Sequence, residues 1–287
     1  VNFKYYEEGQ YMAEQSKTYN NWFPALTLSM PIGKAEMQLS YAADINRPSY
    51  WALRSGTQYD NRYTYETGNP FLISEIARNL SYDLSYQWLT FNFTYTHTSD
   101  PIYQTTEMYK DNTAIGVMKM INGDSYNNIS SALTLEPTIG IWHPSLSASL
   151  EKQWFKMETK EGNYLDKPIA ELHFDNTFDT KWAMFSVMMG YITKGNERNI
   201  YASKPMFNTD LSIYKSILHD QLSFQFYVSD LFGTNDDHTI GKYGKLKELV
   251  DNEYSTTKFS LTVRYKFNTT RSKYKGTGAG QSQKNRM

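Results

Sequence analysis

The stretch from Tyr254 to Phe267 constrains the fold more than any other part of the sequence. Apolar residues at 259, 261, 263, 265 and 267 alternate there with polar residues at 258, 260, 262, 264 and 266. Successive side chains of a strand point to opposite faces, so this stretch predicts a strand with one apolar and one polar face. The apolar face has to meet either a packed protein core or membrane hydrocarbon; transmembrane β-barrels have lipid outside and a polar lumen inside.

The same alternation recurs along the chain and predicts an all-β protein of about twelve strands. Trp182–Tyr191 is apolar on both faces, and its length favours a strand over a helix. The polar run Glu7–Asn20 is predicted to be a loop. The predicted strands cover residues 1–6, 22–30, 35–44, 79–88, 89–108, 114–136, 145–157, 169–179, 182–192, 205–216, 221–230 and 254–267.

Connections between the predicted strands alternate between short and long, with Lys110–Asn112 as the exception. The short ones are Pro31–Gly33, Trp88–Leu89, Pro137–Pro144, Thr180–Lys181 and Ile217–Asp220. The long ones are Glu7–Asn21, Ile45–Glu75, Glu158–Lys167, Lys194–Lys204 and Leu231–Asn252. Bacterial outer-membrane barrels have short periplasmic turns and long exterior loops. This pattern favours a transmembrane antiparallel β-barrel over a soluble β-sandwich.

Composition excludes several classes of protein. A formal net charge of -1 gives no electrostatic reason to expect nucleic acid as a partner. The absence of cysteine excludes a disulfide framework, a thiolate nucleophile and a cysteine-ligated metal. No apolar run reaches the ~18 residues of a membrane-spanning helix. The mean hydropathy of -0.63 still suits a barrel, because half of each strand is polar. Inward positions are expected to be mostly Ser, Thr, Asn and Gln with few charges.

Aromatic residues are plentiful, with 24 Tyr, 15 Phe and 6 Trp, and two roles suit them. Near strand ends they fit an interfacial girdle, in which rings lie at the level of the lipid headgroups. The girdle candidates are Tyr5, Trp22, Tyr41, Trp88, Trp154, Trp182 and Tyr191. Within the connection Ile45–Glu75, aromatic side chains are candidates for stacking on a ligand, with loop packing as the alternative. These ligand-binding candidates are Tyr50, Trp51, Tyr59, Tyr63 and Tyr65.

The sequence carries no motif that assigns a catalytic residue, a cofactor or a metal. The five histidines lack the spacing of a metal site. A barrel hydrolase would need a Ser and a His on adjacent strands. The runs Asp100-Pro101, Asn122-Gly123-Asp124 and Asn235-Asp236-Asp237 contain oxygen ligands suited to calcium, but turns favour the same residues, and turns are expected there.

Two groups of segments carry a more specific signature. Asp44–Tyr50 is followed by Tyr63–Pro70, and Arg264–Thr270 is followed by Lys273–Gly280 and Asn285-Arg286. They resemble the outer-membrane β-barrel family of TonB-dependent receptor-like proteins, and the similarity extends loosely over the whole chain. The pattern departs after Pro70, where the family has a Leu-Lys-Pro-Glu type of run and this chain has Phe71–Glu75.

The resemblance implies that residues 1–267 are the C-terminal portion of a 22-stranded barrel, followed by a basic, glycine-containing periplasmic tail over 268–287. It also implies outer-membrane lipid, an upstream plug, the TonB system and a nutrient of unknown identity as partners. The chain starts at Val1 without a secretion signal, which favours a fragment over an autonomous barrel. The alternatives are a self-contained twelve-stranded pore or adhesin, a barrel hydrolase, and a soluble glycan-binding sandwich.

Overall fold

The computed structural model describes residues 2–7, 10–16, 22–109, 112–156, 164–243, 246–252 and 255–267. These residues form 22 strands in four sheets, and no helix occurs among them. The largest sheet has 12 strands, one of which, β13 (Tyr164–Leu165), lies off the main path. The other eleven are β3 (Ala25–Ile32), β4 (Ala35–Asn46), β7 (Glu75–Tyr86), β8 (Leu89–Ser99), β11 (Tyr126–Leu135), β12 (Trp142–Lys156), β14 (Ile169–Asp179), β15 (Met184–Ile192), β18 (Met206–Ile217), β19 (Leu222–Ser229) and β22 (Lys258–Tyr265).

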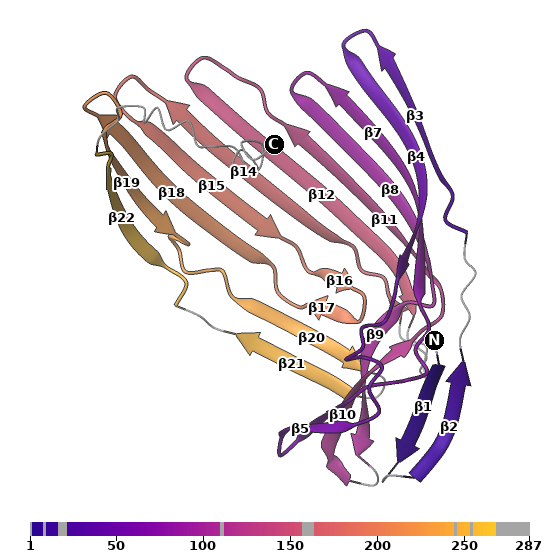
Figure 1. Ribbon diagram of the computed structural model, residues 1–287. Helices are drawn as coiled ribbons and strands as arrows, with labels where there is room; N and C mark the ends of the chain where they lie inside the picture. Colours follow the sequence, from indigo (N-terminus) through magenta and orange to yellow (C-terminus); the bar gives the residue numbers. More distant parts are fainter. Residues whose placement is uncertain are drawn as a thin grey trace, which may run out of the picture.

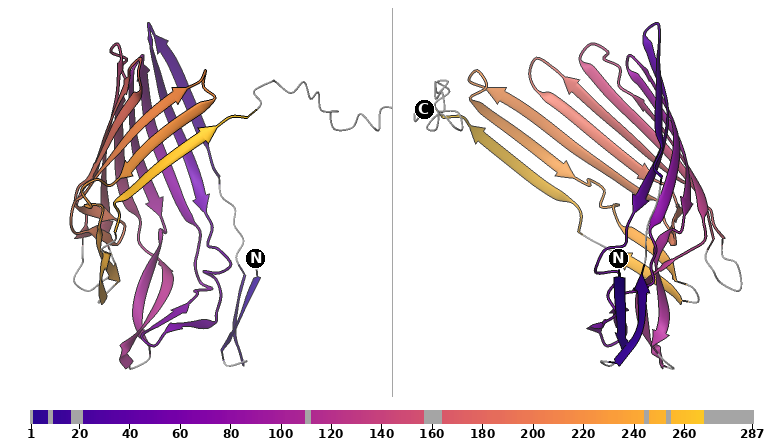
Figure 2. Two further views of the ribbon diagram at one scale, coloured as in Figure 1. Left: turned by 90° about the vertical axis from the view of Figure 1, so that its left-hand side faces the viewer. Right: turned by 45° about the vertical axis from the view of Figure 1, so that its right-hand side comes forward.

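These eleven strands form an up-and-down meander, since each one pairs antiparallel with the next along the chain. The sheet curves but does not close, and β3 and β22 form its two edges (Figures 1 and 2). Eleven of the twelve expected strands correspond to these eleven, and the twelfth, over residues 1–6, corresponds to β1 (Asn2–Glu7) of a separate sheet. Ten further strands form the other three sheets, and seven of them lie in stretches expected to be connections, because they are short or irregular in pattern.

The registers keep apolar side chains on one face across the whole main sheet. Leu84, for example, lies opposite both Met37 of β4 and Phe91 of β8. At the far edge, Phe226 lies opposite Ile213 of β18 and Leu261 of β22. A shift of one residue in any pairing would exchange the two faces, so this apolar face fixes the register of every strand.

The apolar face is left uncovered by protein. Leu28, Leu261 and Phe259 are 57–68% exposed, and many other large apolar side chains on this face are also exposed. Soluble monomers rarely expose so extensive an apolar surface, whereas the outside of a membrane barrel requires one. On β12 the apolar positions run from Trp142 to Leu150, a length that spans ~20 Å of the membrane at the tilt of barrel strands. We call this face the outward face and the opposite one the inward face.

The connections differ between the two ends of the main sheet (Figure 1). At the upper end in Figure 1, neighbouring strands are joined by short turns, such as Gly33-Lys34 and Gln87-Trp88. At the lower end, the connections are long and contain strands of their own. These are β5 (Thr57–Asn61), β6 (Thr64–Thr67), β9 (Ile102–Tyr109), β10 (Asn112–Asn122), β16 (Gly195–Glu197), β17 (Ile200–Ala202), β20 (Asp237–Tyr243) and β21 (Leu246–Asn252). The predicted segregation of short and long connections is confirmed.

Three details of the sequence prediction were wrong. The run Glu7–Asn20 contains strand β2 (Gln10–Ser16), which pairs with β1 (Asn2–Glu7). The single strands expected over 89–108 and over 114–136 are each two strands. The first breaks at Asp100-Pro101, where Asp100 has a φ of 54°, and the second breaks at residues 123–125. The inward face is also more charged than expected. The registers place nine carboxylates there: Glu36, Asp44, Glu75, Asp83, Glu151, Glu171, Asp175, Asp179 and Asp210.

Aromatic side chains mark both borders of the apolar band. Trp142 and Trp182 lie near the short turns, and Tyr95, Trp154 and Tyr191 lie near the long connections. The rings of Trp154 and Trp182 are 45% and 66% exposed on a sheet that has no second layer over it. This arrangement agrees with the girdle interpretation of Trp154, Trp182 and Tyr191, and Trp142 and Tyr95 were not among the expected girdle residues. Among the residues that the structure describes, no helix is long and apolar enough to cross a membrane.

Candidate functional site

The long connections gather into two small sheets below the main sheet. One has the order β5-β6-β10-β9 and the other the order β16-β17-β20-β21. They meet at Asn199, whose Nδ2 donates to the backbone oxygens of Gln104 on β9 and Lys242 on β20, each at 3.1 Å. One side chain thus connects the β8–β11, β15–β18 and β19–β22 connections. This end therefore presents a joined surface rather than a set of separate loops.

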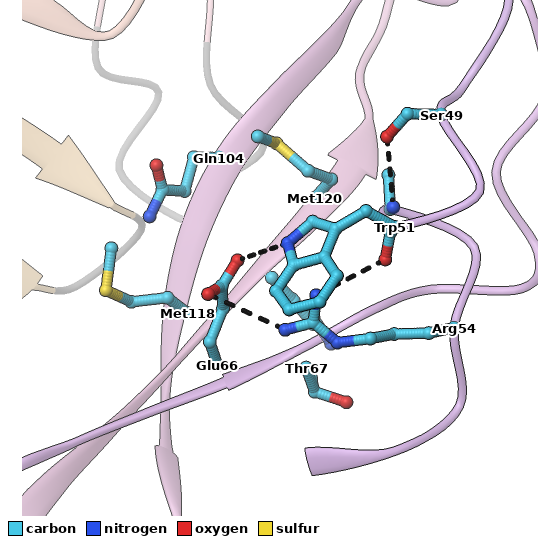
Figure 3. A pocket seen from close by; sticks show the side chains of 10 residues that line it. Ser49, Trp51, Arg54, Glu66, Thr67, Gln104, Met118 and Met120 are labelled. Atoms are coloured by element: carbon cyan, nitrogen blue, oxygen red, sulfur yellow. Dashed lines mark hydrogen bonds and ion pairs between the residues drawn. The ribbon is translucent and has the colours of Figure 1, made fainter. Parts of the chain in front are cut away.

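A pocket of about 100 Å³ opens within the first of these sheets. Figure 3 shows that Trp51 and Arg54 approach it from the β4–β7 connection, with Met118 and Met120 of β10 on the other side. Binding sites for whole small molecules usually have volumes of ~300–1,000 Å³. This pocket is large enough for one chemical group of a ligand. Its lining comprises Ser49, Trp51, Ala52, Arg54, Glu66, Thr67, Gln104, Met118, Lys119 and Met120.

Trp51, Arg54 and Glu66 form the polar side of this pocket (Figure 3). The guanidinium carbon of Arg54 lies 3.3 Å from the centroid of the Trp51 ring. Glu66 accepts a hydrogen bond from Trp51 Nε1 at 3.2 Å and pairs with Arg54 Nη2 at 3.6 Å. The buried Arg54 Nη2 has no hydrogen-bond partner among the described residues. The three groups hold one another in place and leave part of the Trp51 ring, which is 54% exposed, available for contact.

Gly68 allows the two ends of the β4–β7 connection to pack together. A Cβ atom at this position would lie 2.2 Å from the backbone oxygen of Arg54, which is far inside van der Waals contact. The backbone N–H of the next residue, Asn69, donates to the oxygen of Ala52 at 2.6 Å. This close approach gives Gly68-Asn69-Pro70 the structural role that such turn residues usually have.

The structure distributes the five predicted ligand-binding aromatics over three places. Trp51 lines the pocket, and the neighbouring Tyr50 is 91% exposed. Tyr59 and Tyr65 pack together with ring centroids 5.8 Å apart, and Tyr65 also packs edge-on against Tyr109 at 4.8 Å. The Tyr63 ring lies under the Arg62 guanidinium at 4.5 Å. Of the five, only Trp51 lines the pocket, whereas Tyr59 and Tyr65 pack against other tyrosine rings.

A second cluster, which the sequence did not indicate, fastens the β15–β18 connection to the inward face. Arg198 lies at the turn between β16 and β17, with a φ of 47°. Its Nη2 pairs with Glu75 at 3.1 Å, and its Nη1 donates to the backbone oxygen of Ile102 at 2.7 Å. The second oxygen of Glu75 accepts the Ile102 N–H at 2.8 Å. The Glu75 side chain is 8% exposed and so largely removed from water, whereas the Arg198 side chain is 40% exposed.

Gln153 completes this cluster, which we call the Arg198 clamp (Glu75, Ile102, Gln153 and Arg198). Gln153 accepts the Arg198 N–H at 2.7 Å and donates to the Arg198 oxygen at 2.8 Å. The same Nε2 donates to the Leu165 oxygen at 2.6 Å. Beside the clamp lies a small apolar core in which Phe155 meets two tyrosine rings edge-on at 5.2 Å each. The core residues are Tyr103, Tyr126, Phe155 and Leu165.

Asp230 performs a similar role where β19 ends. It is 2% exposed and has a φ of 45°. Burial raises the pKa of this carboxyl. Hydrogen bonds from the Thr256 hydroxyl and from the backbone N–H groups of Asn235, Thr234 and Gly233 outweigh that effect and hold the pKa below its ordinary value. The Asp230 carboxylate therefore stays ionised and ties the start of the β19–β22 connection to its end.

Three of the five histidines have individual polar partners. His97 Nδ1 lies 2.8 Å from Asn127 Oδ1, His173 lies 3.9 Å from a Glu171 oxygen, and His238 contacts Asp251. Among the described residues, no group of three or more His, Asp or Glu side chains is placed to hold a metal ion. The run Asn122-Gly123-Asp124 lies where β10 ends, and Asn122 Nδ2 donates to the backbone oxygens of Ile73 and Asp100 at 3.0 and 2.8 Å.

Comparison with protein families gives one match, which extends over nearly the whole chain. The sequence pattern of the outer membrane protein beta-barrel family matches residues 2–265. No curated protein sequence matches.

Solved structures with a similar fold include siderophore receptors. The siderophore receptor PirA of Pseudomonas aeruginosa is 16% identical, with a TM-score of 0.55 over 74% of this chain and 39% of that one. PirA of Acinetobacter baumannii is 14% identical, with a TM-score of 0.55 over 86% and 41%. The ferric enterobactin receptor PfeA of P. aeruginosa, in complex with enterobactin, is 15% identical, with a TM-score of 0.52 over 85% and 40%. The chain thus spans about two fifths of each receptor.

Proposed function

Because the chain belongs to the outer membrane protein beta-barrel family, we propose that it forms the C-terminal part of the barrel of a TonB-dependent receptor that takes up a nutrient. Its place is the outer membrane of a bacterium, and its fold is that of a transmembrane antiparallel β-barrel. The observation that carries the proposal is the asymmetry of the sheet, with short turns at one end and joined, aromatic-bearing connections at the other.

In this proposal the long connections lie at the cell surface and make the first contact with the nutrient. The exposed Tyr50 and the partly exposed Trp51 offer flat apolar surfaces, and Arg54 and Glu66 hold the Trp51 ring in a fixed orientation. Rigid aromatic groups bind at a low cost in conformational entropy. The upstream plug and the TonB system would supply gating and energy, and residues 268–287, which lie outside the described residues, would form a periplasmic tail.

Labelling of whole cells tests the orientation. In cells that carry the full-length protein, single cysteines at Gln58 and Asn235 should react with an impermeant thiol reagent, because both positions lie in long connections. Cysteines at Lys34, in a short turn, and at Ser282 should stay unlabelled until the outer membrane is permeabilised. Labelling of Lys34 and Ser282 alone in intact cells would mean the opposite orientation.

Nutrient uptake tests the function itself. Deletion of the gene should abolish growth on at least one limiting nutrient in a panel of ferric complexes, cobalamin and oligosaccharides, and loss of TonB should produce the same defect. Re-expression of the full-length protein should restore growth, and a Trp51→Ala variant should restore it less well at low nutrient concentration. Unchanged growth of the deletion strain on every nutrient in the panel would contradict the proposal.

A further inference from the structure

The two faces of the main sheet carry charges of opposite sign. All nine carboxylates of the eleven meander strands lie on the inward face, where the only basic residues of these strands other than histidine are Lys258 and Arg264 of the edge strand. The outward positions of the same described strands carry no carboxylate. They carry four cations, namely Arg78, Lys152, Lys156 and Lys215. The charges are therefore sorted by face, and the cations lie on the side that meets lipid.

Three of the four outward cations gather at one border of the apolar band. Arg78, Lys152 and Lys156 lie near the long-connection ends of β7 and β12, whereas Lys215 lies near a short turn. The register aligns Arg78 with His97, Asn127 and Trp154 across four neighbouring strands. Lys152 lies opposite Ile129. It is two residues before Trp154 on β12, so it lies closer to the apolar band than the row of Arg78 and Trp154. We call Arg78, Lys152 and Lys156, together with this row, the outward cationic patch.

Neighbouring groups hold Arg78 and Lys152 of the outward cationic patch in place without neutralising their charges. Arg78 Nη1 donates to Ser99 Oγ at 3.1 Å, and Lys152 Nζ lies 5.4 Å from the centroid of the Trp154 ring. Between them, Asn127 Oδ1 accepts from Tyr95 Oη at 2.8 Å and lies 2.8 Å from His97 Nδ1. Neither Arg78 nor Lys152 pairs with a carboxylate in the described part of the chain, unlike Arg54, Lys119 and Arg198.

We propose that the outward cationic patch binds the phosphate groups of anionic lipids in the leaflet that surrounds the long-connection end. The position fixes the class of partner, because side chains at this border meet lipid headgroups and not the lumen. Guanidinium and ammonium groups both bind phosphate, and Trp154 and Tyr95 supply rings suited to headgroup depth. The absence of carboxylates from the outward face then has a physical reason, since a carboxylate there would repel the same headgroups.

This inference depends on the orientation of the two faces and not on the nutrient, so it can fail while the proposed uptake stands. Near an anionic surface each basic residue strengthens binding about fivefold at low salt. Loss of both Arg78 and Lys152 should therefore remove most of the preference of the protein for anionic lipid over zwitterionic lipid.

The test measures lipids that stay bound to the purified full-length protein. The protein is equilibrated with equal amounts of phosphatidylglycerol and phosphatidylcholine of the same acyl chains, and the retained lipids are counted by native mass spectrometry. The wild type should retain phosphatidylglycerol in at least fivefold excess at low salt, and less of an excess in 1 M salt. The variant Arg78→Gln/Lys152→Gln should retain the two lipids nearly equally.

The inward face offers a matched control. Lys258→Gln/Arg264→Gln removes one lysine and one arginine from the polar face, and so changes the net charge by the same amount. It should keep the preference for phosphatidylglycerol, as should the charge-conserving variant Arg78→Lys/Lys152→Arg, which serves if the glutamine variant does not fold. An equal loss in the inward variant, or no preference in the wild type, would overturn the proposal.

Discussion

Replacement of Arg198 by methionine should lower the free energy of unfolding of the long-connection end by about 3 kcal/mol. The change leaves the Glu75 carboxylate, which is 8% exposed, without its cation, and removes the hydrogen bond to the Ile102 oxygen. The removal of one partner from a buried ion pair costs ~3–5 kcal/mol. We expect the lower end of that range, because the Arg198 side chain is 40% exposed and the Ile102 N–H still donates to Glu75.

The pair between Lys119 and Glu107 is the matched control for the Arg198 clamp. It is shorter, at 2.7 Å against 3.1 Å, but the Glu107 side chain is 59% exposed. Exposed ion pairs contribute ~0–1 kcal/mol, so Lys119→Met should cost less than 1 kcal/mol. Hydrogen exchange of residues 195–202 in the full-length protein measures the effect, as faster exchange in the Arg198 variant. Equal exchange in both variants would show that the clamp contributes no more than a surface pair.

The sequence predicted the main sheet well because the relevant information is local. Alternation has a period of two, so the strand Ile169–Asp179 and its apolar face could be read from eleven consecutive residues. Turn residues such as Gly33, with a φ of 62°, also act locally. The seven strands that lie in expected connections escaped prediction because they lack clean alternation. In β5, Thr57–Asn61, all five residues are exposed, so no buried face leaves a pattern in the sequence.

The candidate site was predictable only in part, because its contacts join distant residues. Trp51 and Glu66 lie within one connection, and the aromatic content of that connection pointed to Trp51. Glu75 and Arg198 are 123 residues apart, and neither has a neighbour in sequence that marks it as a partner. The sorting of charges between the faces is present in the sequence, but it becomes visible only when the register of every strand is known.

An arginine in the middle of the apolar band should be the most costly single change on the outward face. Leu133 lies between Phe91 and Ala148 on that face, so Leu133→Arg should lower the free energy of unfolding by about 2–4 kcal/mol. The adjacent Ala132 lies on the inward face opposite Asn92 and Ser149. Ala132→Arg therefore keeps its charge in a polar environment and should cost much less. Denaturant unfolding of the full-length protein in lipid vesicles measures both values.

A third substitution, at Ile129, tests where the hydrocarbon ends, because Ile129 lies directly opposite Lys152 on the neighbouring strand. The cost of an outward arginine falls from about 2–4 kcal/mol at mid-membrane to about 0–1 kcal/mol at the interface. Ile129→Arg should thus cost less than Leu133→Arg, although both replace a large aliphatic side chain on one strand. That gradient would place the border of the hydrocarbon at the level of the outward cationic patch. Equal costs at Leu133 and Ala132 would contradict the assignment of the faces, and equal costs at Leu133 and Ile129 would contradict the position of the border.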